Sequence, residues 1–475
     1  MRGGVHRALL PVACVALAAG SLAIQAAPTF DPWAWIGFGR GMVDPAVGFS
    51  TLGRTGWKPL PVLFTAPLGL LGGAAPNLWL VVVRAVVLAG TVLAYRLAAR
   101  VGGRAAGLIA AAGFVASADW LRYGSAGNIE PVVAALLLGA VEVHLRGRRT
   151  IAFVLLVLAG LARPELWPLV GGYGALLAVA DRRWWPLALG IPAMVALWVV
   201  PDWIGSGDPL RTFHAAGRSA EPRALQLSHD PVLGLLDGAA GILAVPIWLG
   251  VVAALVLGWR TRDRTIGALA AVAGAAAVPT IGATALGYPA VPRYLFAVAG
   301  VCCVLGGIGV GAVWRLPRTA AARTAVAVAL AVASTPFAVA RVDGLVRQAA
   351  DAGRRDDDLD ALFRAVAQAR RRAAVACLHP ALRPSVYATA LAWKLGVEPH
   401  AVTASLRPPG RIAFLAHRGR AAIARLPPDA TVTPLAAAGP WRVVVIRWGD
   451  APLASTCRGT TVARAARPRR AAIGP

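Results

Sequence analysis

Charged side chains that could do chemistry stand beside tryptophan and proline, at the ends of apolar runs in this chain. Asp31, in the segment Phe30-Asp31-Pro32-Trp33-Ala34-Trp35, directly follows the first of these runs. A carboxylate in this place could take a proton from a hydroxyl group as a general base. It could also be a solvated charge at a helix end, among the aromatic anchors of a membrane surface. The residues alone leave both interpretations open.

The tripeptide Arg163-Pro164-Glu165 lies in the middle of the apolar stretch 151–179. An unpaired charge within a bilayer span costs at least about 2.5 kcal/mol, so these charges either line a polar cavity or form a mutual ion pair. Both flanks of the stretch are arginine-rich, which predicts two half-length helices that form a hairpin. The tripeptide would then lie at the turn of the hairpin, near the outer half of the membrane.

Other charged groups recur at the ends of apolar runs. Arg84 lies near the predicted outer end of the run 78–98, where it could extend to the membrane surface or line a cavity and hold a phosphate. The remaining candidates are Lys58 after Trp57, the group Asp119, Arg122, Asn128 and Glu130, and Arg293 before Tyr294.

Histidine and cysteine usage predicts no metal centre. His214 and His229 are isolated in a polar stretch, and no CxxC or Cys/His spacing is typical of zinc. Cys377 and Cys457 could form one disulfide if the C-terminal region faces an oxidising compartment, or remain two free thiols. The other three cysteines fall inside apolar runs and are expected to be small packing residues.

Composition indicates an integral membrane protein. The 475 residues are 57% hydrophobic and 15% charged, with a mean hydropathy of +0.64. A soluble domain this apolar could not cover its surface with polar groups. The net charge of +26 does not predict nucleic acid binding, because many arginines lie in short clusters between apolar blocks, as the positive-inside rule requires.

The charge pattern predicts about eleven transmembrane helices in residues 1–340, with the N-terminus cytoplasmic. Short arginine-rich loops are assigned to the cytoplasm, and acid-containing loops to the outside. The first run is expected to be an uncleaved helix, and the proline-containing run 60–71 to be interfacial or re-entrant. The predicted crossing segments are 8–27, 78–98, 105–116, 131–145, the hairpin 151–179, 184–200, 239–259, 266–286, 294–314 and 325–340.

The region after residue 340 contains no run long enough to span. Residues 341–463 are predicted to form a small extracytoplasmic α/β domain, and the basic tail 464–475 to be disordered. Periodicity predicts helices at 357–372 and 385–395 and strands at 373–378 and 441–448. The predicted fold class is therefore an all-α polytopic membrane protein with a small C-terminal α/β domain.

With these features together, the chain resembles the GT-C glycosyltransferase superfamily, especially actinobacterial membrane proteins of the mannosyltransferase-like type. The resemblance covers residues 8–340. It is carried by Asp31-Pro32-Trp33-Ala34-Trp35, Trp57-Lys58-Pro59-Leu60-Pro61, Asp119-Trp120-Leu121-Arg122-Tyr123 with Asn128 and Glu130-Pro131, Arg163-Pro164-Glu165, Gly205-Ser206-Gly207-Asp208-Pro209 and Arg293-Tyr294.

The resemblance implies transfer of a sugar, such as mannose, from a polyprenyl-phosphate donor to an extracytoplasmic acceptor of the cell envelope, a glycan or a lipid. Asp31 would be the general base, and Arg84 and Arg293 would stabilise the departing phosphate. Some relatives use a divalent metal at acids such as Asp119 or Glu130, which stays open here; no other cofactor is expected. The implied substrate-binding residues are Lys58, Arg84, Asp119, Arg122, Asn128, Glu130, Arg163, Glu165 and Arg293.

Two other functions fit the same pattern. A transporter or flippase of a lipid-linked substrate would use a similar outer cavity, although no convincing internal repeat is seen. A non-catalytic assembly protein of the envelope would act through its C-terminal domain. Incorporation of a labelled sugar, movement of the substrate without a new bond, or neither would separate the three.

Overall fold

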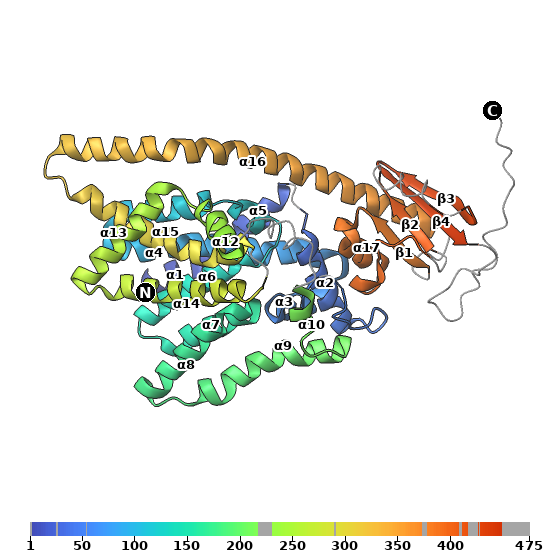
Figure 1. Ribbon diagram of the computed structural model, residues 1–475, viewed down its shortest axis with the longest axis horizontal. Helices are drawn as coiled ribbons and strands as arrows, with labels where there is room; N and C mark the ends of the chain where they lie inside the picture. The colour runs from blue at the N-terminus through green and yellow to red at the C-terminus, as the bar shows by residue number, and fades with distance from the viewer. Residues whose placement is uncertain are drawn as a thin grey trace.

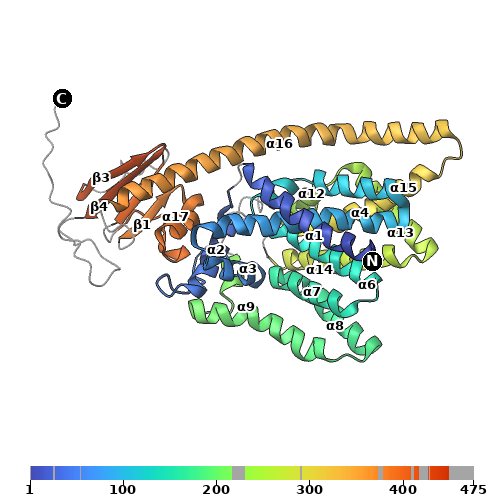
Figure 2. The same cartoon turned by 180° about the vertical axis from the view of Figure 1, so that it is seen from behind.

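The structure, a computed structural model, joins a helical bundle to a small sheet domain through one long helix (Figures 1 and 2). It describes residues 2–24, 27–53, 55–216, 230–288, 291–372, 378–407, 411–416, 426 and 428–448. The C-terminal sheet lies beyond one end of the bundle, and the N-terminus lies toward the other (Figure 1). The expected combination of a mostly helical protein and a small C-terminal sheet is confirmed.

The bundle packs around α15 (Phe296–Arg315), whose apolar span is 83% buried. Its glycines let neighbouring backbones approach closely, as small residues do between membrane helices. A Cβ at Gly309 would lie 1.8 Å from the Gly250 carbonyl oxygen of α13 (Val245–Thr261). On its other side α15 packs on α4 (Ala75–Ala116) and α6 (Glu130–Leu145). The first helix, α1 (Arg2–Gly20), and α14 (Arg264–Ala285) complete this part of the bundle.

Two predicted breaks are present. Helix α4 breaks at Gly103, whose φ of 74° favours glycine, so the predicted segments 78–98 and 105–116 are separate arms. The stretch 151–179 forms two helices, α7 (Arg149–Ala162) and α8 (Trp167–Asp181), joined by the short turn η3 (Pro164–Leu166). Pro164 ends α7 because the residue before a proline disfavours helical backbone, and Arg163 is extended.

By length and composition, five helices of the described part are fit to cross a membrane. A sixth is reached if α12 (Pro231–Ala240) and α13, bent by 99°, form one span. Helix α9 (Ile191–Ser206), with the wide turn 186–190 before it, is among the five. The multi-pass character is therefore supported, and the number eleven and the orientation of the termini stay predictions.

A short helix occupies the segment that was expected to be a loop after the first span. Helix α2 (Phe30–Val43) begins at Phe30 after the extended Thr29, and Pro32 is tolerated in the first turn because no N–H is needed there. Helix α3 (Pro59–Gly69) follows it and is too short to cross, at about 16 Å. The Thr65 hydroxyl donates to the Trp35 carbonyl at 2.8 Å and joins the two helices.

The prediction of separate helices at 325–340 and 357–372 is wrong. Both belong to α16 (Ala320–Arg370), a continuous helix of 51 residues that begins at the N-cap Thr319. The intervening residues 341–356 contain four arginines and three alanines, which favour helix, and no proline that would end it. Helix α16 runs along the bundle and ends in the sheet domain (Figures 1 and 2).

The C-terminal domain is a four-stranded sheet covered by helices. The strands are β1 (His379–Arg383), β2 (Arg411–Leu415), β3 (Ala430–Ala438) and β4 (Trp441–Trp448), in the order β1-β2-β4-β3. Among these four strands, β1 and β2 pair in parallel, and the other two neighbouring pairs are antiparallel. The end of α16 and α17 (Ala388–Leu395) bury one face, with Leu362 and Phe414 in the core. The predicted strand 373–378, Cys377, Cys457 and the tail 464–475 lie almost wholly outside the described residues.

Candidate active site

A cavity of about 460 Å³ lies at the meeting point of several helix starts. It brings together seven of the ten residues singled out from the sequence, although they are far apart along the chain. The charged or amide side chains among them are Asp31, Lys58, Arg122, Asn128, Arg163, Glu165 and Arg293. Glu130 lies directly beside them, in contact with Arg293.

Proline explains how the chain places these charges. Asp31, Lys58, Glu130 and Arg163 each precede a proline that opens a helix or helical turn, and Arg293 follows one. Lys58 and Arg163 have extended backbone before their prolines, as the proline favours. Asp31 and Glu130 lie instead in the first helical turn, where a proline is tolerated. In each case the charged side chain stands at the start of a helix or helical turn. Helix starts carry partial positive charge, so their convergence favours an anionic ligand.

Asp31 lies in the first turn of α2, with its carboxylate 28% exposed. The Thr55 hydroxyl donates a hydrogen bond to Asp31 Oδ1 at 3.1 Å. On the other side, Arg293 Nη2 lies 3.8 Å from Asp31 Oδ2. The carboxylate is thus oriented by one donor and one cation, and remains open to a hydroxyl group in the cavity. This geometry suits a general base.

Arg293 stands between two acids. Its Nε lies 3.9 Å from Glu130 Oε1, and the Glu130 carboxylate is 5% exposed. Because Glu130 is buried, it holds the guanidinium in place and does not reach the cavity surface. Arg293 therefore links the candidate base to a fixed buried charge, and its position is set by that charge.

Lys58 occupies the N-cap position of α3, outside the spanning helices. Its Nζ lies 5.2 Å from the centre of the Trp35 ring. Burial, and secondly the nearby Arg163 guanidinium, lower the pKa of Lys58 to about 8, although Glu130 and Asp31 oppose the shift. The nearby acids thus do not fully offset the cost of burying the Lys58 charge, and an anion in the cavity would stabilise the charged form.

Arg163 lies at the break of the hairpin, over an aromatic wall. Its guanidinium is 4.2 Å from the centre of the Tyr294 ring, and the Tyr288 ring lies next to that of Tyr294 at a tilt of 38°. Within the described part of the chain, Arg163 Nη2 and Glu165 Oε2 have no hydrogen-bond partner. Both residues line the cavity, which favours the cavity-lining interpretation over a purely mutual ion pair.

Two sequence candidates are not brought to the cavity. The Arg84 guanidinium is buried and donates to the Ser125 carbonyl at 2.9 and 3.1 Å and to the Ser21 carbonyl at 2.8 Å. It neither extends to a surface nor lines the cavity; it joins the residue after α1 to the last residue of α5 (Trp120–Ser125). Asp119 accepts from Gln348 of α16 at 2.6 Å and lies outside the lining.

The acids of the site are not arranged for a divalent metal. Asp31 and Glu130 both face Arg293, and Asp119 is turned away toward α16. Among the described residues, no group of three or more His, Cys, Asp or Glu side chains could hold a metal ion. The donor set therefore does not fit the metal that the sequence resemblance left open.

Several cavity residues had no usable signal in the sequence. Thr55, Thr212 and Ser385 carry only hydroxyl groups, which occur on any surface. Thr29 also carries only a hydroxyl group. Its connection to the site becomes visible in the fold, where Asn128 Nδ2 donates to that hydroxyl at 2.9 Å. Tyr288 and Tyr294 flank Arg293 in the sequence and were within the motif, but their role as a wall under Arg163 depends on the fold.

A second cavity of about 340 Å³ adjoins the first. It shares Phe30, Thr55 and Ser385 with the first cavity, and the C-terminal domain supplies one of its walls, including Thr389 and His400. The Thr389 hydroxyl donates to the Phe30 carbonyl at 2.9 Å, which fixes α17 against α2. Asp31 thus lies next to an opening bounded by both domains.

No protein-family model matches the chain, and no curated protein is found similar to it. Among solved structures it is similar to ArnT from Cupriavidus metallidurans in the apo state, with 15% identity and a TM-score of 0.56, covering 93% of this chain and 98% of ArnT. The same enzyme bound to undecaprenyl phosphate gives 16% identity and a TM-score of 0.53, with the same coverage. The likeness confirms the predicted GT-C fold.

Proposed function

We propose that this protein is a membrane glycosyltransferase that moves a sugar from a polyprenyl-phosphate donor to an acceptor of the cell envelope on the extracytoplasmic side. The observation that carries the proposal is the cavity, in which an accessible carboxylate, Asp31, lies beside a group of cations. The similar structure bound to undecaprenyl phosphate supports a polyprenyl phosphate as the carrier. Mannose is the sugar suggested by the sequence resemblance.

The donor phosphate would bind among Lys58, Arg163 and Arg293. The cavity and its immediate neighbour Glu130 contain four cations, with Arg122 the fourth, and three acids, Asp31, Glu130 and Glu165. One positive charge is therefore left over, and the helix starts add to it. A phosphodiester carries one negative charge and would balance the site. Arg84, tied to backbone carbonyls outside the cavity, has no part in this binding.

The proposed reaction needs only these groups. The acceptor hydroxyl attacks the anomeric carbon of the donor, and Asp31 takes the hydroxyl proton as the new glycosidic bond forms. The bond from the anomeric carbon to the phosphate oxygen breaks, and the polyprenyl phosphate leaves with the electron pair. Lys58, Arg163 and Arg293 stabilise the negative charge that gathers on the departing phosphate. Glu130 keeps Arg293 in place during this step.

The acceptor would reach Asp31 through the second cavity. Thr55 belongs to both cavities and donates to Asp31 Oδ1, so a hydroxyl group arriving from that side comes close to the carboxylate. The C-terminal domain, which supplies part of the wall, would select the acceptor. In this arrangement the N-terminus is cytoplasmic and the C-terminal domain extracytoplasmic.

Membrane vesicles that contain the protein and a radiolabelled polyprenyl-phosphate sugar test the proposal. We expect label to appear in an envelope glycan or lipid, and to be lost in the Asp31→Ala variant. Movement of labelled donor across the vesicle membrane without a new glycosidic bond would identify a transporter instead. If neither occurs while the wild type is folded and the donor binds, the protein is an assembly factor, and the transferase proposal fails.

A further inference from the structure

The segment 51–58, called the strap below, forms the partition between the two cavities. Leu52, Gly53 and Thr55 line the second cavity, while Thr55, Gly56 and Lys58 line the first. Arg54 lies outside the described residues. The strap thus carries both the hydroxyl that orients Asp31 and the cation proposed for the donor phosphate. Its position decides where those two groups stand.

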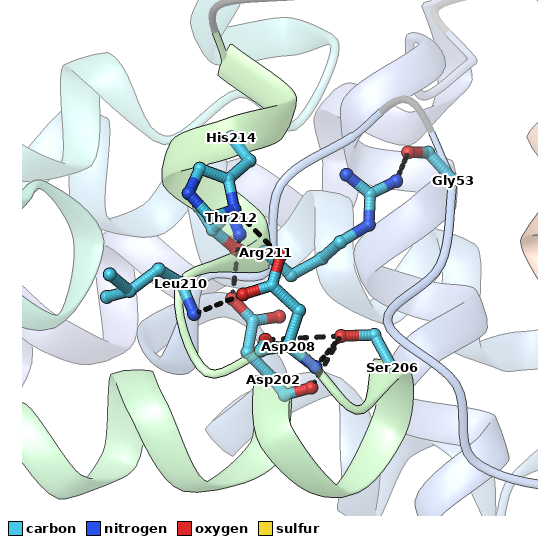
Figure 3. Close-up of polar contacts among 8 residues, drawn as sticks. All are labelled: Gly53, Asp202, Ser206, Asp208, Leu210, Arg211, Thr212 and His214. Atoms are coloured by element: carbon cyan, nitrogen blue, oxygen red, sulfur yellow. Dashed lines mark hydrogen bonds and ion pairs between the residues drawn. The ribbon is translucent and has the colours of Figure 1, made fainter.

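The described residues of the strap form no regular helix or strand, so their position depends on individual contacts. The corner between α9 and α10 (Arg211–Ala216), residues 202–212, supplies three of them. The Thr51 N–H donates to the Gly205 carbonyl at 3.2 Å. Arg211 Nη2 donates to the Gly53 carbonyl at 2.7 Å, as Figure 3 shows. The Trp57 N–H donates to Thr212 Oγ1 at 2.8 Å.

Asp202 connects the two ends of the corner. Its side chain is 1% exposed, and its Oδ2 accepts from the Thr212 N–H at 2.9 Å (Figure 3). This bond fixes the residue whose hydroxyl receives the Trp57 N–H, one position before Lys58. A buried carboxylate depends on the hydrogen bonds that it keeps, so this bond ties Asp202 to the Thr212 backbone. Asp202 itself does not line either described cavity.

The strap and the corner are closely packed against each other. A Cβ at Gly56 would lie 2.7 Å from Thr212 Cγ2, and a Cβ at Gly205 would lie 2.8 Å from the Thr51 nitrogen. Glycine is therefore favoured on both sides: at Gly205 the two backbones approach each other, and at Gly56 the strap backbone packs on the Thr212 side chain. A shift of Thr212 would be passed directly to Gly56 and Trp57 and from there to Lys58.

We propose that Asp202, acting through Thr212, and Arg211 are positioning residues that hold the strap so that Thr55 and Lys58 face the reacting groups. This inference rests on the proposed function for its meaning in catalysis, but the geometry it claims can be measured without any sugar transfer. Asp202 and Arg211 would act without touching the substrate.

The pKa of Lys58 is a measure of the position of the strap. With the strap in the position seen in the structure, the Lys58 ammonium group lies over the Trp35 ring. Burial is the main reason that its pKa falls to about 8, and the neighbouring charges are those of Asp31, Glu130, Arg163 and Arg293. A loosened strap would let water reach the ammonium group and would move the pKa upward. The chain contains only two lysines, Lys58 and Lys394, and Lys394 is exposed, so it serves as an internal reference.

The test is competitive labelling of the purified full-length protein with an amine reagent at a series of pH values, read by mass spectrometry. We expect Lys58 of the wild type to be half-reactive near pH 8. In Thr212→Val and Asp202→Ala the midpoint should rise by at least one pH unit. Thr212→Ser, which restores the hydroxyl, should return it to the wild-type value.

Asp208→Asn is the matched control. Asp208 belongs to the same corner, but its carboxylate accepts from the Leu210 N–H and pairs with His214, and no described hydrogen bond joins it to the strap (Figure 3). We expect no change of the midpoint in this variant. Where Asp202→Ala or Thr212→Val does not fold, Arg211→Gln, which removes the bond to the Gly53 carbonyl, takes its place and should raise the midpoint in the same direction.

An unchanged Lys58 midpoint in the folded variants would overturn the inference, whatever the protein transfers. If the midpoint shifts as expected but wild-type vesicles transfer no sugar, the positioning role stands and the proposed function fails. If both hold, the variants should also lose donor affinity, and Thr212→Ser should recover it.

Discussion

Glu130 and Glu142 lie on the same helix, α6, and each is a buried carboxylate paired with arginine at an opposite end of the bundle. Glu130 contacts Arg293 at the cavity, whereas Glu142 contacts Arg96, Arg100 and Arg146. Their separation along the helix axis is about 18 Å. One carboxylate cannot balance three guanidinium groups, so the Glu142 end keeps an excess of positive charge.

This charge difference predicts the orientation of the protein. The positive-inside rule places the Glu142 end in the cytoplasm and the cavity outside. In a background without Cys377 and Cys457, we expect Asp208→Cys to react with an impermeant thiol reagent in intact cells. Arg183→Cys, near the other end, should react only after the membrane is opened. The reverse pattern would contradict both the topology and an extracytoplasmic acceptor.

The parts of the fold that could be predicted from the sequence are those that depend on local sequence patterns. The apolar blocks, the turn at Pro164 and the strand 441–448 were found because length, proline and periodicity act locally. Helix α2 was missed because its sequence, with Gly37, Gly39 and Gly41 between aromatic residues, has low helix propensity. Its helical form depends on packing against α3 and α17, which no local pattern contains.

The site was predictable where charge and proline coincide. Asp31, Lys58, Glu130 and Arg163 stand at helix starts, and helix starts converge in the fold. The predicted role of Arg84 in phosphate binding is not supported by the fold. Its place inside an apolar run indicated a function, but its guanidinium donates to the Ser21 and Ser125 carbonyls. Which way a side chain points from a helix depends on its neighbours, and a single sequence does not record them.

Replacement of Asp31 by asparagine should abolish most of the sugar transfer and leave donor binding intact. The amide keeps the shape and can still accept from Thr55, but it cannot take a proton. Removal of a general base typically lowers the rate about 10²- to 10⁴-fold. Initial rates and donor affinity in detergent measure the two effects separately.

Asp44→Asn is the control for this change. Asp44 lies at the other end of α2, pairs with Arg40 at 3.1 Å and does not line the cavity. Its transfer rate should stay close to that of the wild type. An Asp31→Asn variant that kept more than about a tenth of the activity would exclude Asp31 as the base.

Donor affinity should weaken as pH rises, because the pKa of Lys58 is about 8. The charged fraction of such a group falls from about 90% at pH 7 to about 10% at pH 9, while a donor phosphodiester keeps its charge. The dissociation constant for the donor should therefore rise about tenfold over this range if only the charged lysine binds it. Titrations of labelled donor at several pH values provide the measurement.

Lys58→Arg separates the loss of the Lys58 charge from general effects of alkaline pH. An arginine stays charged throughout this range, so the affinity of this variant should be nearly independent of pH. Its absolute affinity will also change, because a guanidinium is larger and planar; only the slope with pH is compared. Equal slopes in both proteins would show that Lys58 does not hold the phosphate.

Trp33 should be the residue that most strongly fastens the C-terminal domain to the bundle. It lies in α2, is 5% exposed, and its ring stands 6.2 Å from Phe363 of α16 and 6.4 Å from Trp393 of α17. Trp33→Ala removes both aromatic contacts and should cost about 3–5 kcal/mol. Because the second cavity takes part of its wall from this domain, acceptor use should fall more than donor binding does.

Hydrogen exchange of the α17 amides measures this loosening directly. In Trp33→Ala these amides should exchange at least about tenfold faster, since 1.4 kcal/mol of lost docking already corresponds to a factor of ten. Trp259→Ala is the control: this side chain is largely exposed on α13, far along the chain from the interface, and its loss should leave α17 unchanged. Unaltered α17 exchange in Trp33→Ala would mean that the domain is held by Arg40, whose guanidinium donates to the Trp393 carbonyl at 3.3 Å, and by Thr389 instead.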